Sequence, residues 1–164
     1  MTNWIYMIKE IEESAGNLYL TISKKTKNVY PEISALFHQL YKDEVHHGGQ
    51  ADFICTLYKE SESSFNSNEK NRGILSDRIK FIKDIEKVIE EKEMYLHPVD
   101  LLKIAVELEE DLGEGHELIS EGVSDPEMKK LISSLALEDK VHAKRIRDFL
   151  EAYEKDIPGL ENTE

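Results

Sequence analysis

Apolar residues recur at alternating intervals of three and four along most of the chain, the pattern of helices that bury one face. Gly and Pro are scarce, with 8 and 4 among 164 residues, and stand mostly where helices would end. Residues 61–73 are polar and aperiodic, which predicts a loop. The fold class is therefore all-α, with helices over about residues 3–27, 32–59, 76–92, 98–122 and 126–155.

The connections between these segments predict how the helices are arranged. A turn of only a few residues, around 28–31, joins the first two helices, and residues 124–127 read Ser-Asp-Pro-Glu, a capping-box pattern that opens the last helix. Short turns make antiparallel neighbours. We therefore expect two helical hairpins joined by a long crossover that contains a short helix. Together they form a four-helix bundle, and residues 1–164 form a single domain.

Each of the four bundle helices carries ionisable side chains inside its apolar stripe. One such residue alone is more often a helix-end residue or a hydrogen-bonded core group, but here all four helices repeat the pattern. Buried carboxylates cost several kcal/mol each unless they are paired, and these stripes contain no Lys or Arg. The pattern therefore predicts a multivalent cation, held by Glu12, Glu44, His47, Glu109, Asp139 and His142.

An internal repeat relates the two halves of the chain. Residues 10–20 align with 107–117, and residues 40–47 align with 135–142. Each half thus supplies one lone carboxylate and one carboxylate-x-x-His pair. Residues i and i+3 share a helix face, so each pair can offer an oxygen and a nitrogen to neighbouring metals.

The pattern resembles the rubrerythrin-like branch of the ferritin-like superfamily of di-iron carboxylate proteins. Residues 12–19 look like the ExxAxxxY pattern of the family's first helix, residues 43–47 like the second-helix ExxH element, and residues 139–145 like the fourth-helix element. The resemblance implies a ferritin-like bundle that holds two metal ions, most often iron, with manganese or zinc as alternatives. It also implies a role for each ligand. Glu44 and Asp139 would bridge the two metals, Glu12 and Glu109 would be terminal carboxylates, and His47 and His142 would each give one nitrogen.

The chain departs from the family pattern at several positions. Asp139 stands where the family usually has Glu, and its shorter reach leads us to expect two metal positions of unequal affinity. Leu112 replaces an additional carboxylate of the third helix. His116 occupies the place that Tyr19 has in the first repeat, which leaves open a supporting role beside the metals or an ordinary, partly buried His. A rubredoxin-like tail is absent, so electrons would come from a separate donor protein such as rubredoxin.

Composition excludes several classes of partner. Acidic residues outnumber basic ones by 34 to 21, for a net charge of −13, which argues against binding to nucleic acid or to an anionic membrane. Neither a signal peptide nor a membrane span is evident, so we expect a cytoplasmic protein. The single cysteine, Cys55, excludes an internal disulfide and a thiolate metal site. The metal ligands must therefore be oxygen and nitrogen.

The leading functional hypothesis is a di-iron oxidoreductase that acts as a rubrerythrin-like peroxidase on hydrogen peroxide, or as a ferroxidase that uses oxygen. A carboxylate and imidazole ligand set suits iron or manganese chemistry. The first alternative is a protein that binds or stores iron without catalysis. The second is a metal-free helical interaction module, which would leave the carboxylates unexplained. The sequence leaves both enzymatic activity and homodimer formation open.

Overall fold

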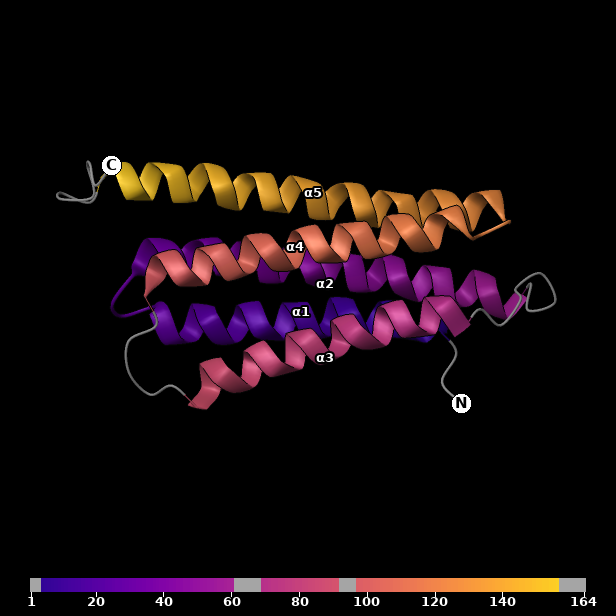
Figure 1. Ribbon diagram of the computed structural model, residues 1–164, viewed down its shortest axis with the longest axis horizontal. Coiled ribbons are helices and arrows are strands. Elements are labelled where there is room, and N and C mark those ends of the chain that lie inside the picture. Colours follow the sequence, from indigo (N-terminus) through magenta and orange to yellow (C-terminus); the bar gives the residue numbers. More distant parts are fainter. Residues whose placement is uncertain (1–3, 61–68, 92–96, 157–164) are drawn as a thin grey trace.

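The computed structural model describes residues 4–60, 69–91 and 97–156 of the chain. Helices α1, α2, α4 and α5 lie side by side as a bundle, and α3 crosses α1 obliquely (Figure 1). The described residues contain no strand. The expected all-α bundle of two hairpins joined by a crossover is therefore confirmed, with helices α1 (Trp4–Thr26), α2 (Pro31–Glu60), α3 (Glu69–Glu91), α4 (Pro98–Glu121) and α5 (Pro126–Lys155).

The ends of the helices follow from local chemistry. The Asp125 side chain caps α5 by accepting a 2.8 Å hydrogen bond from the Met128 backbone N–H, and Pro126 occupies the first helical position. The capping-box interpretation placed the cap at Ser124, one residue too early. Between α1 and α2, the Ser23 and Ser34 hydroxyls each donate to the other residue's backbone carbonyl, at 2.9 and 2.8 Å. These bonds fix the first hairpin next to its turn.

The crossover helix is longer than the sequence indicated. It begins at Glu69, seven residues before the predicted start at residue 76, so the predicted loop is wrong for residues 69–73. Residues 61–68 lie outside the described part of the chain. Asn71 and Leu75 are both buried, and this packing extends the helix through Gly73, which costs about 1 kcal/mol relative to Ala. Arg78 ties α3 to α4 by bonding both the carbonyl and the carboxylate of Asp111.

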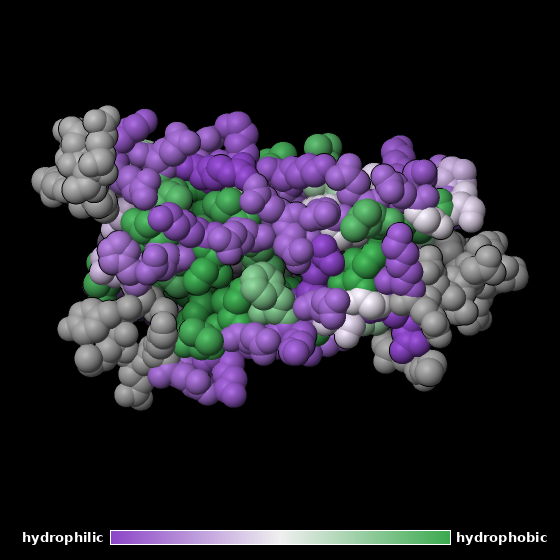
Figure 2. Space-filling model, viewed as in Figure 1, coloured by the Kyte–Doolittle hydropathy of each residue, from purple (hydrophilic) through white to green (hydrophobic). Residues whose placement is uncertain are grey.

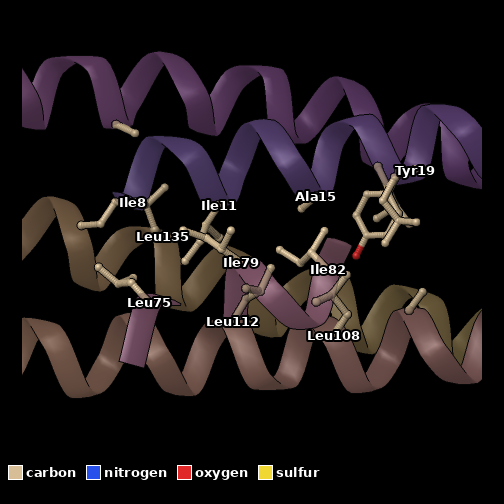
Figure 3. Packing of buried hydrophobic residues seen from close by; sticks show 14 of the residues in the cluster. Ile8, Ile11, Ala15, Tyr19, Leu75, Ile79, Ile82, Leu108, Leu112 and Leu135 are labelled. Carbon is tan, nitrogen blue, oxygen red and sulfur yellow. The ribbon is translucent and has the colours of Figure 1, made fainter. Parts of the chain in front are cut away.

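A layer of buried aliphatic side chains fills the space between the helices (Figure 3). Ile8 and Ile11 of α1 meet Ile79 and Ile82 of α3 together with Leu112 of α4 in this core. Full burial of one such side chain contributes roughly 1.5–3 kcal/mol. The core therefore fixes the positions of the polar residues that interrupt it.

The face of the molecule in Figure 2 is mainly hydrophilic, although hydrophobic side chains gather near its centre. This surface agrees with the high proportion of charged residues, 34% of the chain. Within the described ranges, no helix combines the length and the apolar character needed to cross a membrane.

Candidate metal centre

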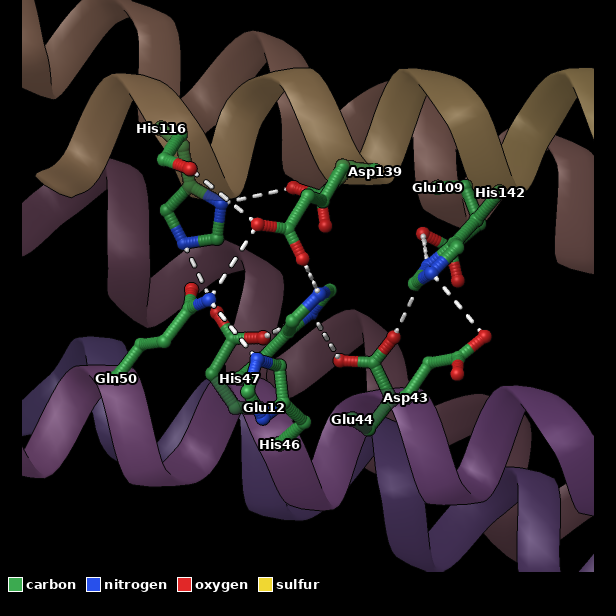
Figure 4. Close-up of polar contacts among 12 residues, drawn as sticks. Glu12, Asp43, Glu44, His46, His47, Gln50, Glu109, His116, Asp139 and His142 are labelled. Atoms are coloured by element: carbon green, nitrogen blue, oxygen red, sulfur yellow. Dashed lines mark hydrogen bonds and ion pairs between the residues drawn. The ribbon is translucent and has the colours of Figure 1, made fainter. Parts of the chain in front are cut away.

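The six side chains predicted from the sequence meet in the middle of the bundle (Figure 4). They come from α1, α2, α4 and α5, and at most 4% of any of them is exposed. One oxygen or nitrogen from each member lies within 4.8 Å of the others in each of three overlapping groups. These groups are Glu12, His47 and Asp139; Glu109, Asp139 and His142; and Glu44, His47 and His142.

Two glycines that correspond in the internal repeat let the helices approach closely at this level. Each follows a lone glutamate by four residues, Gly16 after Glu12 and Gly113 after Glu109. A Cβ atom at Gly16 would lie 3.2 Å from the Cβ of Glu44, and one at Gly113 would lie 3.4 Å from the Cβ of Asp139. A side chain at Gly16 would crowd Glu44, and one at Gly113 would extend against Asp139 and the Ala136 carbonyl, so the repeated glycines leave room for these carboxylates.

The Nδ1 atoms of two stacked imidazoles face the carboxylates. His47 Nδ1 lies 3.5 Å from Glu12 Oε2 and 3.3 Å from Glu44 Oε2. His142 Nδ1 lies 3.3 Å from Glu44 Oε1 and 3.4 Å from Glu109 Oε2. The two ring centroids are 5.1 Å apart. These distances exceed the usual 2.7–3.2 Å of an N–H···O hydrogen bond, so Glu44 stands between the imidazoles without binding either tightly.

The Nε2 atoms of the same imidazoles point outward, toward two carboxylates that the sequence reasoning missed. His47 Nε2 lies 2.7 Å from Glu138 on α5, and His142 Nε2 lies 3.5 Å from Asp43 on α2. Asp43 also forms a 2.6 Å ion pair with Arg145. Asp43 directly precedes Glu44, and Glu138 directly precedes Asp139. An acidic residue just before each carboxylate-x-x-His pair is the sequence feature that could have predicted these contacts. When Nε2–H donates a hydrogen bond to a carboxylate, the neutral imidazole keeps its proton on Nε2, and Nδ1 is left unprotonated and able to bind a metal.

Tyr19 and His116, which the repeat aligns, reach opposite carboxylates across the bundle. The Tyr19 hydroxyl donates a 2.5 Å hydrogen bond to Glu109 Oε1. His116 is 1% exposed, with Nδ1 2.8 Å from Asp139 Oδ2 and Nε2 3.2 Å from Glu12 Oε1. Of the two interpretations left open for His116, the structure therefore favours a role beside the candidate centre. His46 is exposed, in contrast to its neighbour His47.

Asp139 occupies a shared position in the cluster despite its short side chain. It belongs to one group with Glu12 and His47 and to another with Glu109 and His142. Beside it α5 lies close to α4, since a Cβ at Gly113 would be 3.3 Å from the Ala136 carbonyl oxygen. Unequal affinity of the two metal positions stays a prediction.

The buried imidazoles and carboxylates of the cluster shift one another's pKa values. Burial disfavours charged imidazoles, but the adjacent carboxylates outweigh it and raise the pKa of His47 to about 12 and those of His116 and His142 to about 10. Burial, reinforced by repulsion from Glu109, raises the pKa of Glu44 to about 8. Burial would also raise the pKa of Glu12, but its contacts with His116 and His47 lower it below the ordinary value.

Several inward-facing atoms lack a hydrogen-bond partner among the described residues. They are Glu12 Oε1 and Oε2, Glu44 Oε1, Glu109 Oε2, Asp139 Oδ1, His116 Nε2 and His142 Nδ1. Most of them have only imidazole–carboxylate ion-pair contacts of 3.2–3.5 Å. Metal ions among them would satisfy these atoms, and a mixed oxygen and nitrogen set suits iron, manganese or zinc. The residues present therefore fit a metal centre.

The family model of rubrerythrin matches residues 9–98, which is more than half of the chain. The chain belongs to the rubrerythrin family. The matched segment contains Glu12, Glu44 and His47, whereas the candidate ligands of α4 and α5 lie beyond it and rest on the internal repeat and the geometry of the bundle. Neither the curated proteins nor the solved structures contain a match to this chain.

Proposed function

We propose that this member of the rubrerythrin family is a di-iron oxidoreductase that reduces hydrogen peroxide or oxygen with electrons from a separate donor protein. The observation that carries the proposal is the set of three overlapping carboxylate and imidazole groups, whose inward atoms are buried and mostly lack a hydrogen bond. A pair of iron ions supplies, when bound, the electrons that reduce the oxidant.

We infer that the three overlapping groups would hold two ions between them. Glu12 and His47 would hold one ion, and Glu109 and His142 would hold the other. Glu44 and Asp139 would be shared between the two ions. Glu44 lies near both imidazoles, and Asp139 is grouped with each of the two lone glutamates. Glu138 orients His47 from outside, and Tyr19 fixes one oxygen of Glu109. The protein thus sets the ligand positions before metal arrives.

We expect the same residues to release protons when they bind metal. In the metal-free protein the imidazoles and Glu44 hold protons near neutral pH, because their pKa values lie at about 8 or above. Metal ions displace protons from their ligands. We therefore expect metal uptake to release protons and to strengthen as the pH rises.

Two surface hollows lead toward the candidate centre. One, of about 490 Å³ between α1 and α2, is lined by Gly16, Gly48, Gly49 and Glu44 among others. The other, of about 230 Å³ between α2 and α5, is lined by residues that include His47 and His142. A Cβ at Gly48 or Gly49 would meet no atom within 4 Å, so these glycines leave the first hollow open. This hollow suits the access of a metal ion or a small oxidant.

Metal analysis combined with an oxidant assay tests the proposal. The protein is purified without chelator, loaded with ferrous iron under anaerobic conditions, and mixed with hydrogen peroxide or oxygen. Two irons per chain, oxidised by peroxide in the ratio of two irons to one peroxide, would support the peroxidase function. Two bound irons that neither oxidant oxidises faster than free iron would favour metal binding or storage instead. A chain that binds no metal would refute the proposal.

A further inference from the structure

His116 breaks the symmetry of the internal repeat at the centre of the bundle. On one side, the Tyr19 hydroxyl donates a hydrogen bond to Oε1 of Glu109, so only Oε2 of that carboxylate lacks a hydrogen bond. On the other side, Glu12 receives no comparable hydrogen bond, and its two oxygens have only ion-pair contacts, with His116 at 3.2 Å and with His47 at 3.5 Å. The residue that faces Glu12 from the matching place is an imidazole instead of a phenol.

The two nitrogens of His116 have different kinds of contact. Its Nδ1 lies 2.8 Å from Asp139 Oδ2, which is the length of a hydrogen bond. Its Nε2 lies 3.2 Å from Glu12 Oε1 without forming a hydrogen bond. His47 has the same arrangement, with one nitrogen 2.7 Å from Glu138 and the other 3.5 Å from Glu12 Oε2. In both residues, one nitrogen is held by a carboxylate and the other lies near Glu12, although His47 Nδ1 also lies 3.3 Å from Glu44 Oε2.

The spacing around Glu12 fits ligands of one metal ion. Two ligand atoms that lie about 2.1 Å from a metal and at right angles to each other are about 3.0 Å apart. His47 approaches Oε2 of Glu12, and His116 approaches Oε1. An ion held by both oxygens of Glu12 would therefore have one imidazole beside each oxygen. His116 does not belong to the three groups described above, but it contacts two of their members, Glu12 and Asp139.

We propose that His116 is a third imidazole ligand, which joins Glu12 and His47 at one of the two metal positions while Asp139 holds its Nδ1 proton. This inference rests on the proposed metal centre. Asp139 would then have two roles. Its Oδ2 accepts the hydrogen bond from His116, and its Oδ1, which has no hydrogen bond, would bind metal. The Glu12 position then has two imidazoles and both oxygens of Glu12. Besides the shared Glu44 and Asp139, the Glu109 position would have one imidazole and one oxygen of Glu109 that Tyr19 does not bind, so we expect it to bind metal more weakly.

Counting the imidazoles on the metal tests the proposal directly. The full-length protein is loaded with two equivalents of cobalt(II), and strongly shifted, exchangeable imidazole N–H signals are counted by proton NMR, with ¹⁵N-labelled histidine for assignment. Each metal-bound imidazole keeps one N–H on its far nitrogen. We expect three such signals from the wild-type protein, and two from His116→Phe and from His116→Tyr. Two signals from the wild-type protein would overturn the proposal without any variant.

Metal titration gives a second readout with a matched control. His116→Phe should weaken the tighter cobalt position at least tenfold, with the weaker position little changed. Tyr19→Phe, which removes the corresponding group from Glu109, should affect only the weaker position. Equal weakening of both positions by His116→Phe, or no weakening, would contradict the proposed ligand role. A wild-type chain that binds no cobalt would refute the metal centre itself, whereas two bound ions with two imidazoles would refute only the role of His116.

Discussion

Metal binding should stabilise the folded protein strongly, because the candidate ligands come together only in the bundle. An ion that binds only the folded state adds about 2.7 kcal/mol when its free concentration is 100 times Kd. Two such positions add about 5 kcal/mol. For a chain of 164 residues, 1 kcal/mol raises the melting temperature by about 2–4 °C. We therefore expect a rise of about 10–20 °C between chelated and metal-saturated protein in differential scanning calorimetry.

Paired substitutions show whether this rise depends on the buried glutamates. Glu12→Gln with Glu109→Gln removes both lone carboxylates and should abolish most of the rise. Glu13→Gln with Glu110→Gln changes the adjacent exposed residues and should preserve it. Two results would refute the reasoning. One is an unchanged melting temperature after verified removal of metal, and the other is normal metal stoichiometry in the first double variant.

Three further predictions follow from the contacts and pKa values of the centre. The metal-free protein should lose stability between about pH 5 and pH 10, measured by urea unfolding, because folding raises the pKa of Glu44 from 4.5 to about 8 and that of His142 from 6.5 to about 10. The folded state then binds protons that the unfolded state has released, and stability that rises over this range would contradict these shifts. Glu138→Gln should weaken metal binding about 10–100-fold because it removes the carboxylate partner of His47, while Glu151→Gln on the exposed face of α5 should have no effect in the same titration. Gly48→Leu should slow metal uptake in stopped-flow experiments without changing the final stoichiometry, since its side chain would enter the hollow beside Glu44, and an unchanged rate would exclude that route.

Hydrophobic periodicity was sufficient to predict the bundle and the convergence of its six polar core residues. Helices impose a fixed angle between successive side chains, so Glu44 and His47 must share a face wherever the helix lies. The short turns then bring matching heights of each hairpin together. The start of α3 was missed because the burial of Asn71 depends on contacts with other helices, which a polar sequence around Gly73 does not indicate.

The partners of the candidate ligands depend on how the two hairpins face each other. Glu138 lies one position away from the apolar stripe, and only the packing of α2 against α5 brings it to His47. His116 was correctly placed on the stripe, but periodicity along a helix does not indicate which carboxylates its two nitrogens contact. Those contacts, with Glu12 and Asp139, come from two other helices.

Anomalous diffraction from crystals of the metal-loaded protein tests the central claim most directly. Data collected on both sides of the iron absorption edge locate every bound iron ion without any assumption about its ligands. We predict two anomalous peaks inside the bundle, one beside Glu12 and His47 and one beside Glu109 and His142. An iron-loaded protein with no peak among these residues, or with peaks only at its acidic surface, would contradict the account.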